Sequence, residues 1–254
     1  MYHQELDSAS TIVRRAGEIA LQYWRTGLEA QTKADASPVT IADQAAERAI
    51  VEWLEEAYPQ DGLLGEEGAS KPGSSGRRWI IDPIDGTRDF LRGNRAWGVL
   101  IGLEEAGEVV AGAVYLPALD ELYTARKGGG AFCNGEPIRV SSIASPQQAV
   151  ICVNGINTLL EYPFALDLLR SLDRYWSVRS MGGCLDAMLL ARGQADVWIE
   201  PAGKAWDFAP LKIIIEEAGG RWFNFDGAAS IHGGNCVAVT PLLETEARRL
   251  IRLY

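Results

Sequence analysis

The sequence has few of the residues on which several common enzyme classes depend. It contains only two histidines, His3 and His232, so histidine-based triads and zinc sites have little to draw on. The four cysteines lie far apart without a C-x-x-C pair, which indicates neither a disulfide framework nor a thiolate metal site and fits a reduced cytoplasm. The motifs of P-loop, nucleophile-elbow and zinc-protease enzymes are also missing.

Positive charge and long apolar runs are scarce as well. Lys and Arg total 24 against 34 Asp and Glu, a formal net charge of −10, which repels a nucleic-acid backbone over most of the surface. No segment approaches the roughly 20 consecutive apolar residues that cross a bilayer, and the first ten residues lack a signal-peptide pattern. We therefore expect a cytoplasmic protein that binds neither nucleic acid nor membranes.

What the sequence does contain is enough apolar material for one large domain or two lobes, because 47% of its residues are hydrophobic. Apolar residues at helical spacing predict helices over residues 10–24 and 41–57. Residues 97–140 predict antiparallel strands, whereas strands and helices alternate from about residue 149 onward. We predict an N-terminal α+β lobe over residues 1–145 and a C-terminal α/β lobe over residues 146–254.

The stretch RRWIIDPIDGTRDF contains a pattern with chemical meaning. Its apolar strand ends at Asp82, and a second carboxylate, Asp85, follows Pro83. This composition is by itself typical of a surface turn. However, Gly86-Thr87 opens a predicted helix, so N–H groups of its first turn would face both carboxylates. Carboxylates suit a hard cation such as Mg²⁺, which can bridge to a phosphate, and the stretch therefore indicates phosphoryl chemistry.

Further carboxylates follow or precede apolar segments elsewhere in the chain. Glu66 and Glu67 follow the run LLG, and Asp207 precedes the helical run LKIIIEEAGG. Each of these residues alone is more often a helix cap or a solvated side chain. Together with Asp82 and Asp85 they strengthen the prediction of a metal-assisted reaction on phosphate.

A thiol phosphatase is the weaker alternative. The segment CNGEPIR, residues 133–139, has the Cys-x₅-Arg spacing of that class, whose loop must give successive N–H groups to phosphate. Here Pro137 removes one donor and Glu136 adds charge of the wrong sign. Asn134-Gly135 instead predicts a hairpin turn.

Four stretches resemble the inositol monophosphatase family, magnesium-dependent and lithium-sensitive phosphatases that share their fold with fructose-1,6-bisphosphatase. They are SPVTIAD, GEE, WIIDPIDGTRDF and AWDFAPLKIIIEEAGG, and they occur in the family's order across nearly the whole chain. The resemblance implies an α/β fold, a layered α-β-α-β-α sandwich of the inositol monophosphatase and fructose-1,6-bisphosphatase type. It also implies a homodimer that hydrolyses a small phosphorylated metabolite.

The resemblance further implies a set of site residues. Two to three Mg²⁺ ions would be held by Glu66, Asp82, the carbonyl of Ile84, Asp85 and Asp207. A metal-activated water near Glu66 and Thr87, with Asp43 beside it, would attack phosphorus without a covalent intermediate. The N–H groups of Gly86 and Thr87 would bind the phosphate. The implied contacts to the rest of the substrate are Gly183, Cys184 and Glu200.

The identity of the substrate depends on a few residues. Arg88-Asp89 makes the stretch DGTRDF more similar to the histidinol-phosphatase branch, so we expect histidinol phosphate first and inositol 1-phosphate second. The same pair resembles the Lys-Glu of 3′-phosphoadenosine 5′-phosphate phosphatases, which keeps that nucleotide and fructose 1,6-bisphosphate open. Glu200 could accept hydrogen bonds from hydroxyls or pair with an ammonium, and does not separate these substrates. A phosphometabolite-binding regulatory protein is the non-enzymatic alternative.

Overall fold

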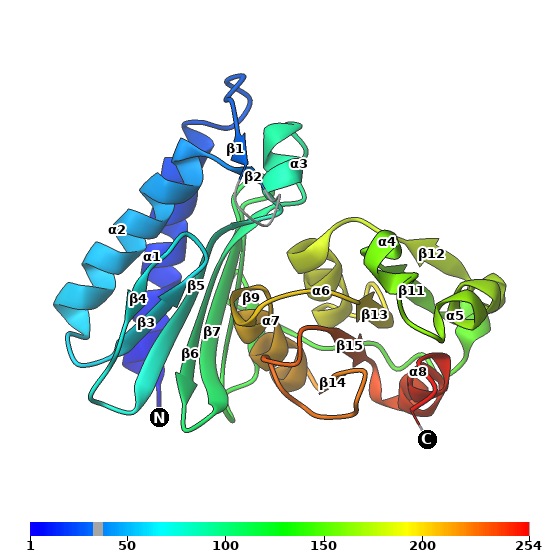
Figure 1. Ribbon diagram of the computed structural model, residues 1–254. Coiled ribbons are helices and arrows are strands. Elements are labelled where there is room, and N and C mark those ends of the chain that lie inside the picture. Colours follow the sequence, from blue (N-terminus) through cyan, green and yellow to red (C-terminus); the bar gives the residue numbers. More distant parts are fainter. Residues whose placement is uncertain (33–37, 254) are drawn as a thin grey trace.

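Helical layers alternate with β-sheets through the molecule (Figure 1). The computed structural model describes residues 1–32 and 38–253. Two long helices cover one face of an eight-stranded sheet, a second pair lies between this sheet and a five-stranded sheet, and three shorter helices cover the outer face. The pairs are α1 (His3–Leu21) with α2 (Ile41–Ala57) and α6 (Gly183–Ala191) with α7 (Ala205–Glu217), and the outer helices are α4 (Ile156–Leu159), α5 (Ala165–Ser171) and α8 (Glu244–Leu250). This arrangement confirms the predicted α-β-α-β-α sandwich.

The eight-stranded sheet is antiparallel apart from one pair of strands. In spatial order its strands are β10 (Glu136–Ile138), β9 (Ala131–Cys133), β8 (Glu121–Arg126), β7 (Glu108–Leu116), β6 (Gly98–Glu105), β5 (Arg77–Asp85), β3 (Gly62–Gly65) and β4 (Ser70–Lys71). Since β3 and β5 run parallel, their carboxyl ends lie at the same edge of the sheet. Glu66 directly follows β3, and Asp82 and Asp85 lie on the last part of β5, so the sheet brings these predicted ligands to one edge.

The five-stranded sheet comes from the second half of the chain. In spatial order its strands are β12 (Ser177–Arg179), β11 (Val150–Val153), β13 (Val197–Glu200), β15 (Cys236–Val239) and β14 (Arg221–Phe223), and the 3₁₀ turns of this half are η1 (Pro146–Gln148), η2 (Leu172–Arg174) and η3 (Pro241–Leu243). β11 runs parallel to β12 and β13, and the other pairs are antiparallel. Helix α7 packs on the first sheet although it belongs to the second half of the chain. The division into two lobes near residue 145 stays a prediction.

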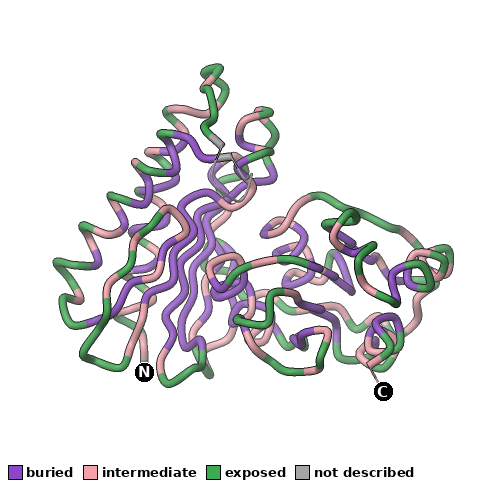
Figure 2. Tube along the Cα trace, viewed as in Figure 1, coloured by how far each residue is buried: buried purple, intermediate pink, exposed green. Residues whose placement is uncertain are grey.

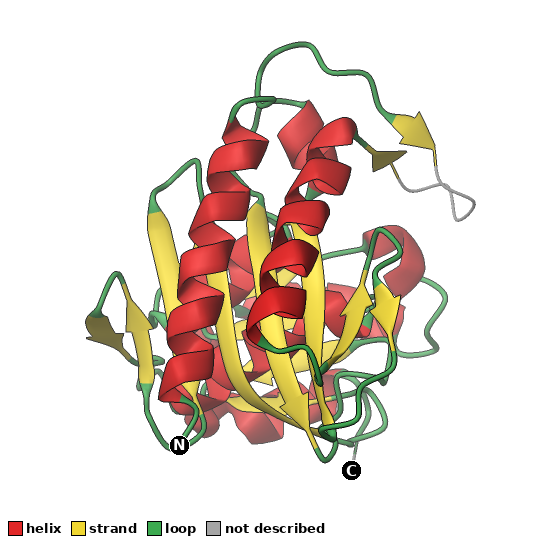
Figure 3. Cartoon of the chain, turned by 90° about the vertical axis from the view of Figure 1, so that its left-hand side faces the viewer, coloured by secondary structure: helices red, strands yellow, loops and turns green. Residues whose placement is uncertain are grey.

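Helices α1 and α2 lie side by side across the outer face of the first sheet (Figure 3). α1 begins at His3, not at residue 10 as predicted, because Leu6 and Ala9 continue the apolar stripe toward the N-terminus. α2 begins as predicted, since the Thr40 hydroxyl accepts the N–H of Asp43, whose carboxylate accepts the N–H of Thr40. None of the helices in the described part of the chain is both long and apolar enough to cross a membrane.

Two smaller pieces lie beyond the end of the first sheet (Figure 1). They are the strand pair β1 (Gln31–Thr32) with β2 (Pro38–Val39) and the helix α3 (Thr87–Leu91). The motif SPVTIAD begins at Ser37, which lies outside the described residues. A small apolar cluster that includes Ile84, Phe90 and Trp97 fixes α3 to the end of β5. The rings of Phe90 and Trp97 pack in a T-shaped arrangement, with ring centroids 4.9 Å apart.

Two glycines allow α7 to approach the first sheet closely. Gly102 on β6 and Gly112 on β7 are direct partners across the two strands. A Cβ at Gly102 would lie 2.7 Å from the Cβ of Ala209, and one at Gly112 would lie 2.8 Å from the Cα of Pro210. A side chain at either position would therefore push the helix, and Asp207 near its start, away from the sheet. Figure 2 shows the strands of this sheet as the most continuous buried part of the chain.

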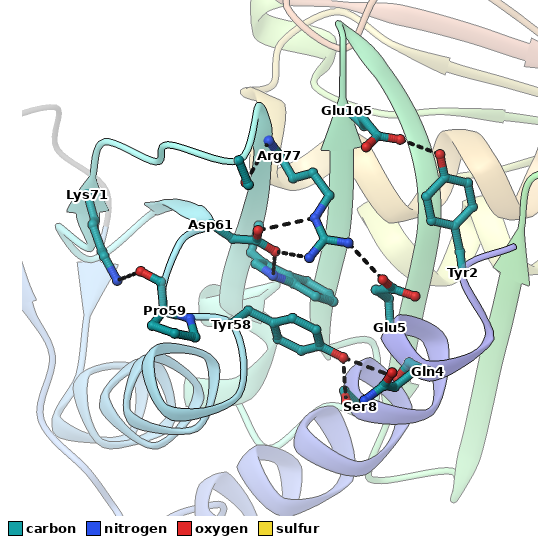
Figure 4. Close-up of polar contacts among 12 residues, drawn as sticks. Tyr2, Gln4, Glu5, Ser8, Tyr58, Pro59, Asp61, Lys71, Arg77 and Glu105 are labelled. Atoms are coloured by element: carbon teal, nitrogen blue, oxygen red, sulfur yellow. Dashed lines mark hydrogen bonds and ion pairs between the residues drawn. The ribbon is translucent and has the colours of Figure 1, made fainter.

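A buried carboxylate joins the first sheet to α1 (Figure 4). Asp61, just before β3, accepts hydrogen bonds from Arg77 Nε at 3.1 Å and from Trp79 Nε1 at 3.0 Å. Arg77 also forms an ion pair with Glu5 of α1, with 2.7 Å between Nη1 and Oε1. Only 2% of the Asp61 side chain is exposed. The carboxylate is thus fully paired where water cannot solvate it, and it ties together α1, β3 and β5.

Replacing Asp61 with alanine is expected to lower the free energy of unfolding by about 2 to 4 kcal/mol, because the change removes one of the two carboxylates that pair with Arg77 and leaves the buried indole N–H of Trp79 without its acceptor. Urea denaturation followed by tryptophan fluorescence measures this loss. The exposed pair of Glu55 with Lys71 provides the control, and Glu55→Ala is expected to change the free energy of unfolding by no more than about 0.5 kcal/mol. Equal effects of the two variants would contradict the assignment of Asp61 as a buried anchor.

Gly112→Ala tests the close contact of α7 with the sheet. The added methyl group must displace the helix or bend β7, so we expect the free energy of unfolding to fall by about 1 to 3 kcal/mol. Urea denaturation measures the change. An unchanged denaturation midpoint would show that α7 has room at this contact.

Candidate active site

A cavity of about 280 Å³ lies where the first sheet, α3, α6, α7 and the end of β13 meet. All predicted site residues except Asp43 and Cys184 line this cavity. The structure therefore brings together residues that lie more than one hundred positions apart in the sequence, from Glu66 to Asp207.

A break in the pairing of β5 aims two carboxylates into the cavity. Asp82 pairs with Leu100 of β6, and Asp85 pairs with Gly98, so β5 has one more residue than its partner between these two pairs. In a regular strand, residues three apart point to opposite faces. The extra residue is a β-bulge that includes Pro83, and it turns Asp82 and Asp85 to the same side.

Asp82, Asp85 and Asp207 form a compact group. Each carboxylate contributes one oxygen to a set of three oxygens that all lie within 4.8 Å of one another. Asp207 reaches this group from the first turn of α7, where it also accepts the N–H of Lys204. Such a set of oxygens, provided by closely spaced carboxylates, could hold a metal ion.

Burial and mutual repulsion dominate the electrostatics of this group. Burial, followed by the charges of neighbouring carboxylates, raises the pKa of Asp82 well above its usual range. Burial and the charge of Asp85 raise the pKa of Asp207 to about 7, and burial likewise raises the pKa of Asp85. Asp82 Oδ2 is buried and accepts no hydrogen bond from any residue that the structure describes. Among the described residues, no basic side chain forms an ion pair with these three carboxylates to offset their repulsion.

Glu66 lines the cavity from the turn after β3 and lies outside the group of three. Its N–H donates to the carbonyl of Ile81 at 3.1 Å, which extends the pairing of β3 with β5 by one residue. Glu47 of α2 holds this turn from behind, since its carboxylate accepts two N–H groups of the turn at 2.9 and 3.0 Å. The sequence analysis missed Glu47, although a carboxylate on the buried face of the predicted helix 41–57 was a signal for it.

The start of α3 places a hydroxyl and a tight backbone turn beside the carboxylates. Gly86 has φ of 84°, and a Cβ there would lie 2.6 Å from the carbonyl oxygen of Ala96, so only glycine fits. Thr87 Oγ1 lies 3.1 Å from the carbonyl of Ile84 and 3.4 Å from Asp43 Oδ1, and can donate to either.

Asp43 and Ile84 reach the cavity in different ways. Asp43 is fully buried behind Thr87 and does not line the cavity, and burial raises its pKa. The side chain of Ile84 packs in the apolar cluster beside α3, so what this residue offers to the cavity is its backbone. Thr87 therefore connects Asp43 to the cavity.

The opposite wall comes from α6 and β13. Cys184 donates its N–H to Asp85 Oδ2 at 2.9 Å, while its side chain is buried in the core between the layers. Gly183 lines the cavity, and a Cβ there would lie 3.2 Å from Asp85 Oδ1. Glu200, at the end of β13, is largely buried, and its burial raises its pKa to about 8. Cys184 thus contributes its backbone N–H to this wall and not its side chain.

Three further residues belong to the site without having been predicted as site residues. Arg88 and Asp89 of α3 line the cavity, although the sequence analysis used them only to compare substrates. Asn154 follows β11, and its side chain lowers the pKa of Glu200 against the effect of burial, while its Nδ2 is buried without a hydrogen-bond partner among the described residues. A polar residue at the carboxyl end of a strand parallel to β13 was a signal for it, because ligands bind at such ends.

The segment with the spacing of a thiol phosphatase lies elsewhere. Residues 133–138 form the end of β9, a tight turn and β10, and Arg139 follows β10. The turn residues Asn134 and Gly135 have φ of 50° and 83°. This is the predicted hairpin turn. Burial raises the pKa of the Cys133 thiol, so less of it is present as the nucleophilic thiolate. Cys133 also does not line the cavity.

Comparisons with known proteins agree on one family. Residues 2–252 match the inositol monophosphatase family model. The chain is 42% identical over 233 residues to a histidinol-phosphatase of Chlorobaculum parvum, covering 91% of this chain and 89% of that protein. It is 34% identical over 250 residues to an inositol-1-monophosphatase of Rhizobium meliloti, covering 96% and 92%. Its structure is similar to the extragenic suppressor protein suhB of Bartonella henselae, with a TM-score of 0.92 and 31% identity over 98% of both chains. The chain therefore belongs to the inositol monophosphatase family of phosphoric monoester hydrolases.

Proposed function

We propose that this protein hydrolyses histidinol phosphate to histidinol and phosphate in a Mg²⁺-dependent reaction. The observation that carries the proposal is the group of Asp82, Asp85 and Asp207, whose oxygens lie within 4.8 Å of one another. This group lies in a cavity beside the turn of Gly86 and Thr87. A cation and a phosphate can be bound together only where both kinds of partner meet.

The residues present fit a hard divalent cation. The side-chain donors are carboxylates, and one oxygen of Asp82 is buried without a donor among the described residues. Burial, followed by the charges of neighbouring carboxylates, raises the pKa values of Asp82 and Asp207. The proposed ligands of two to three ions are Glu66, Asp82, the Ile84 carbonyl, Asp85 and Asp207. Bound Mg²⁺ would lower the pKa of a water molecule and offset negative charge on the phosphate oxygens.

The remaining groups suit an in-line displacement at phosphorus. The first N–H groups of a helix have no partner within that helix, so those of Gly86 and Thr87 can bind phosphate oxygens. A water between Glu66 and the Thr87 hydroxyl attacks phosphorus and gives a proton to the Glu66 carboxylate. The Thr87 hydroxyl donates a hydrogen bond to Asp43, and this leaves a lone pair of the Thr87 oxygen directed toward that water. The bond from phosphorus to the ester oxygen breaks, and the leaving oxygen takes up a proton from solvent, to which Glu66 releases the proton that it accepted.

The choice of substrate rests on similarity and on the wall of the cavity. The histidinol-phosphatase named above is more similar to this chain than the inositol-1-monophosphatase is, at 42% against 34% identity. Inositol 1-phosphate is the second candidate, because Glu200 can accept hydrogen bonds from hydroxyls. Arg88, which lines the cavity, could pair with a second phosphate, so bisphosphates remain to be compared. The homodimer implied by the family resemblance stays a prediction.

Asp85→Asn is expected to reduce kcat with Mg²⁺ by on the order of 10³-fold or more, because the change removes a charge that holds the cation. Phosphate release should be measured on histidinol phosphate, inositol 1-phosphate, fructose 1,6-bisphosphate and 3′-phosphoadenosine 5′-phosphate. Histidinol phosphate is expected to have the highest kcat/KM with the unmodified protein.

Asp173→Asn is the matched control, since Asp173 lies in the turn η2, away from the cavity. It is expected to leave turnover unchanged, and circular dichroism should show that both variants are folded. Full activity of Asp85→Asn would mean that the reaction takes place elsewhere. No turnover of any substrate by the unmodified protein would favour the phosphometabolite-binding regulatory protein.

Asp207→Asn is expected to stabilise the metal-free protein at pH 8. The pKa of Asp207 is about 7 in the folded chain and about 3.9 in an unfolded chain. The folded state therefore binds more protons between these values, and the free energy of unfolding falls as the pH rises through that window. Asparagine removes this loss, so we expect a gain of about 1 to 3 kcal/mol over the unmodified protein at pH 8.

Urea denaturation in EDTA at pH 8 and at pH 4 measures the difference, which should nearly vanish at pH 4. Adding Mg²⁺ at pH 8 should then stabilise the unmodified protein more than the variant. A variant that is less stable than the unmodified protein at both pH values would contradict the raised pKa of Asp207.

A further inference from the structure

Asp89 is a carboxylate of the cavity that the reaction at phosphorus does not use. It lies on α3, four residues after Asp85, and its side chain is half-buried. Its Oδ2 faces the start of α6, because a Cβ on Gly182 would lie 3.5 Å from that atom. Asp89 therefore stands across a narrow gap from the backbone of the opposite wall.

The carboxylate is held in place from behind. Asn94 Nδ2 donates to Asp89 Oδ1 at 2.5 Å, and the N–H of Asn94 donates to the carbonyl of Asp89 at 2.9 Å. The amide of Asn94 is itself oriented by the N–H of Arg95, which donates to its Oδ1 at 2.6 Å. The hydrogen bond from Asn94 fixes Asp89 Oδ1 and leaves Oδ2 facing the cavity. Because the carboxylate is already oriented, little conformational entropy is lost when a ligand binds to Oδ2.

Asp89 has no positive partner within the part of the chain that the structure describes. Arg88 is the one basic side chain among the described residues of the lining, and it forms no ion pair with Asp89. Within the described part of the chain, the Asp89 carboxylate therefore faces the cavity without an ion-pair partner. A carboxylate without an ion-pair partner favours a cationic group of a ligand.

The geometry of α6 connects this wall to the reacting centre. A Cβ on Gly183 would lie 3.2 Å from Asp85 Oδ1, and a Cβ on the preceding Gly182 would lie 3.5 Å from Asp89 Oδ2. The two glycines thus span the distance from the carboxylate group to Asp89 without side chains. An alcohol bound to phosphorus beside Asp85 can extend over this glycine pair and place its far substituent at Asp89.

We propose that Asp89 determines specificity by binding a cationic substituent of the substrate alcohol, an ammonium above all, and so selects amino-alcohol phosphates over neutral polyol phosphates. The inference rests on the proposed phosphatase function and deepens it to a class of substrate. A carboxylate that accepts a hydrogen bond from an ammonium discriminates against the same molecule without the charge by about 10- to 100-fold.

The test compares Asp89→Asn with the unmodified enzyme on three substrates with Mg²⁺. These are histidinol phosphate, N-acetylhistidinol phosphate, which lacks the ammonium charge, and inositol 1-phosphate. The unmodified enzyme is expected to prefer the free amine over its acetylated form by about 10- to 100-fold in kcat/KM. Asp89→Asn should lower kcat/KM for histidinol phosphate by a similar factor, mainly through KM, and leave the other two substrates within about twofold of the unmodified enzyme.

Two further variants separate specificity from a structural role. Asp89→Glu keeps the charge and should retain part of the preference for the amine. Asn94→Ala frees the Asp89 side chain and should reduce the preference by less than Asp89→Asn does. If Asp89 only caps α3, Asp89→Asn will lower the melting temperature and kcat/KM for all three substrates alike, and the inference is overturned.

The control Asp173→Asn should leave the ratio of the two histidinol derivatives unchanged. An unmodified enzyme that hydrolyses both derivatives equally well would overturn the inference and leave the proposed phosphatase intact. An unmodified protein that hydrolyses none of the three substrates, nor the bisphosphates, would overturn both.

Discussion

The mutual repulsion of three carboxylates is the constraint on which the rest of the structure depends. Asp82, Asp85 and Asp207 hold oxygens within 4.8 Å of one another, in a setting where burial already penalises charge. Side chains on mobile segments would move apart under such repulsion. The fold therefore carries these three residues on a bulged strand of a central sheet and on a helix packed directly against that sheet. Holding these carboxylates together lowers the stability of the folded protein and leaves a site that is ready to bind positive charge.

Each wall of the cavity is rigid for a reason that lies outside it. The paired glycines of β6 and β7 set the distance of α7 from the sheet and hence the position of Asp207. Glu47 holds the turn that carries Glu66, and Asn94 holds Asp89. These supporting contacts leave the reacting groups few alternatives, which is what catalysis by positioned charges requires.

Much of the fold and of the site could be predicted from local patterns. The hairpin turn at Asn134-Gly135, the cap at Thr40 and the alternation of strands and helices after residue 149 follow from short-range chemistry, and the structure has all three. The early start of α1 and the roles of Glu47 and Asn154 were missed. Each depends on which face of an element is buried, and that is decided by packing between distant segments.

The sequence by itself determined the chemical inventory of this protein: carboxylates in DPID and AWD, a glycine turn after them, and almost no histidine or paired cysteine to support another chemistry. Only the tertiary structure decided which of these groups share a cavity. Parallel pairing of β3 with β5 and the packing of α7 join segments more than one hundred residues apart. It also decided that Cys184 offers only its N–H, and that Asp89 faces Gly182 just before α6. The physical reason is that a motif specifies local backbone and side-chain chemistry, whereas distances between motifs are set by burial of the elements that carry them.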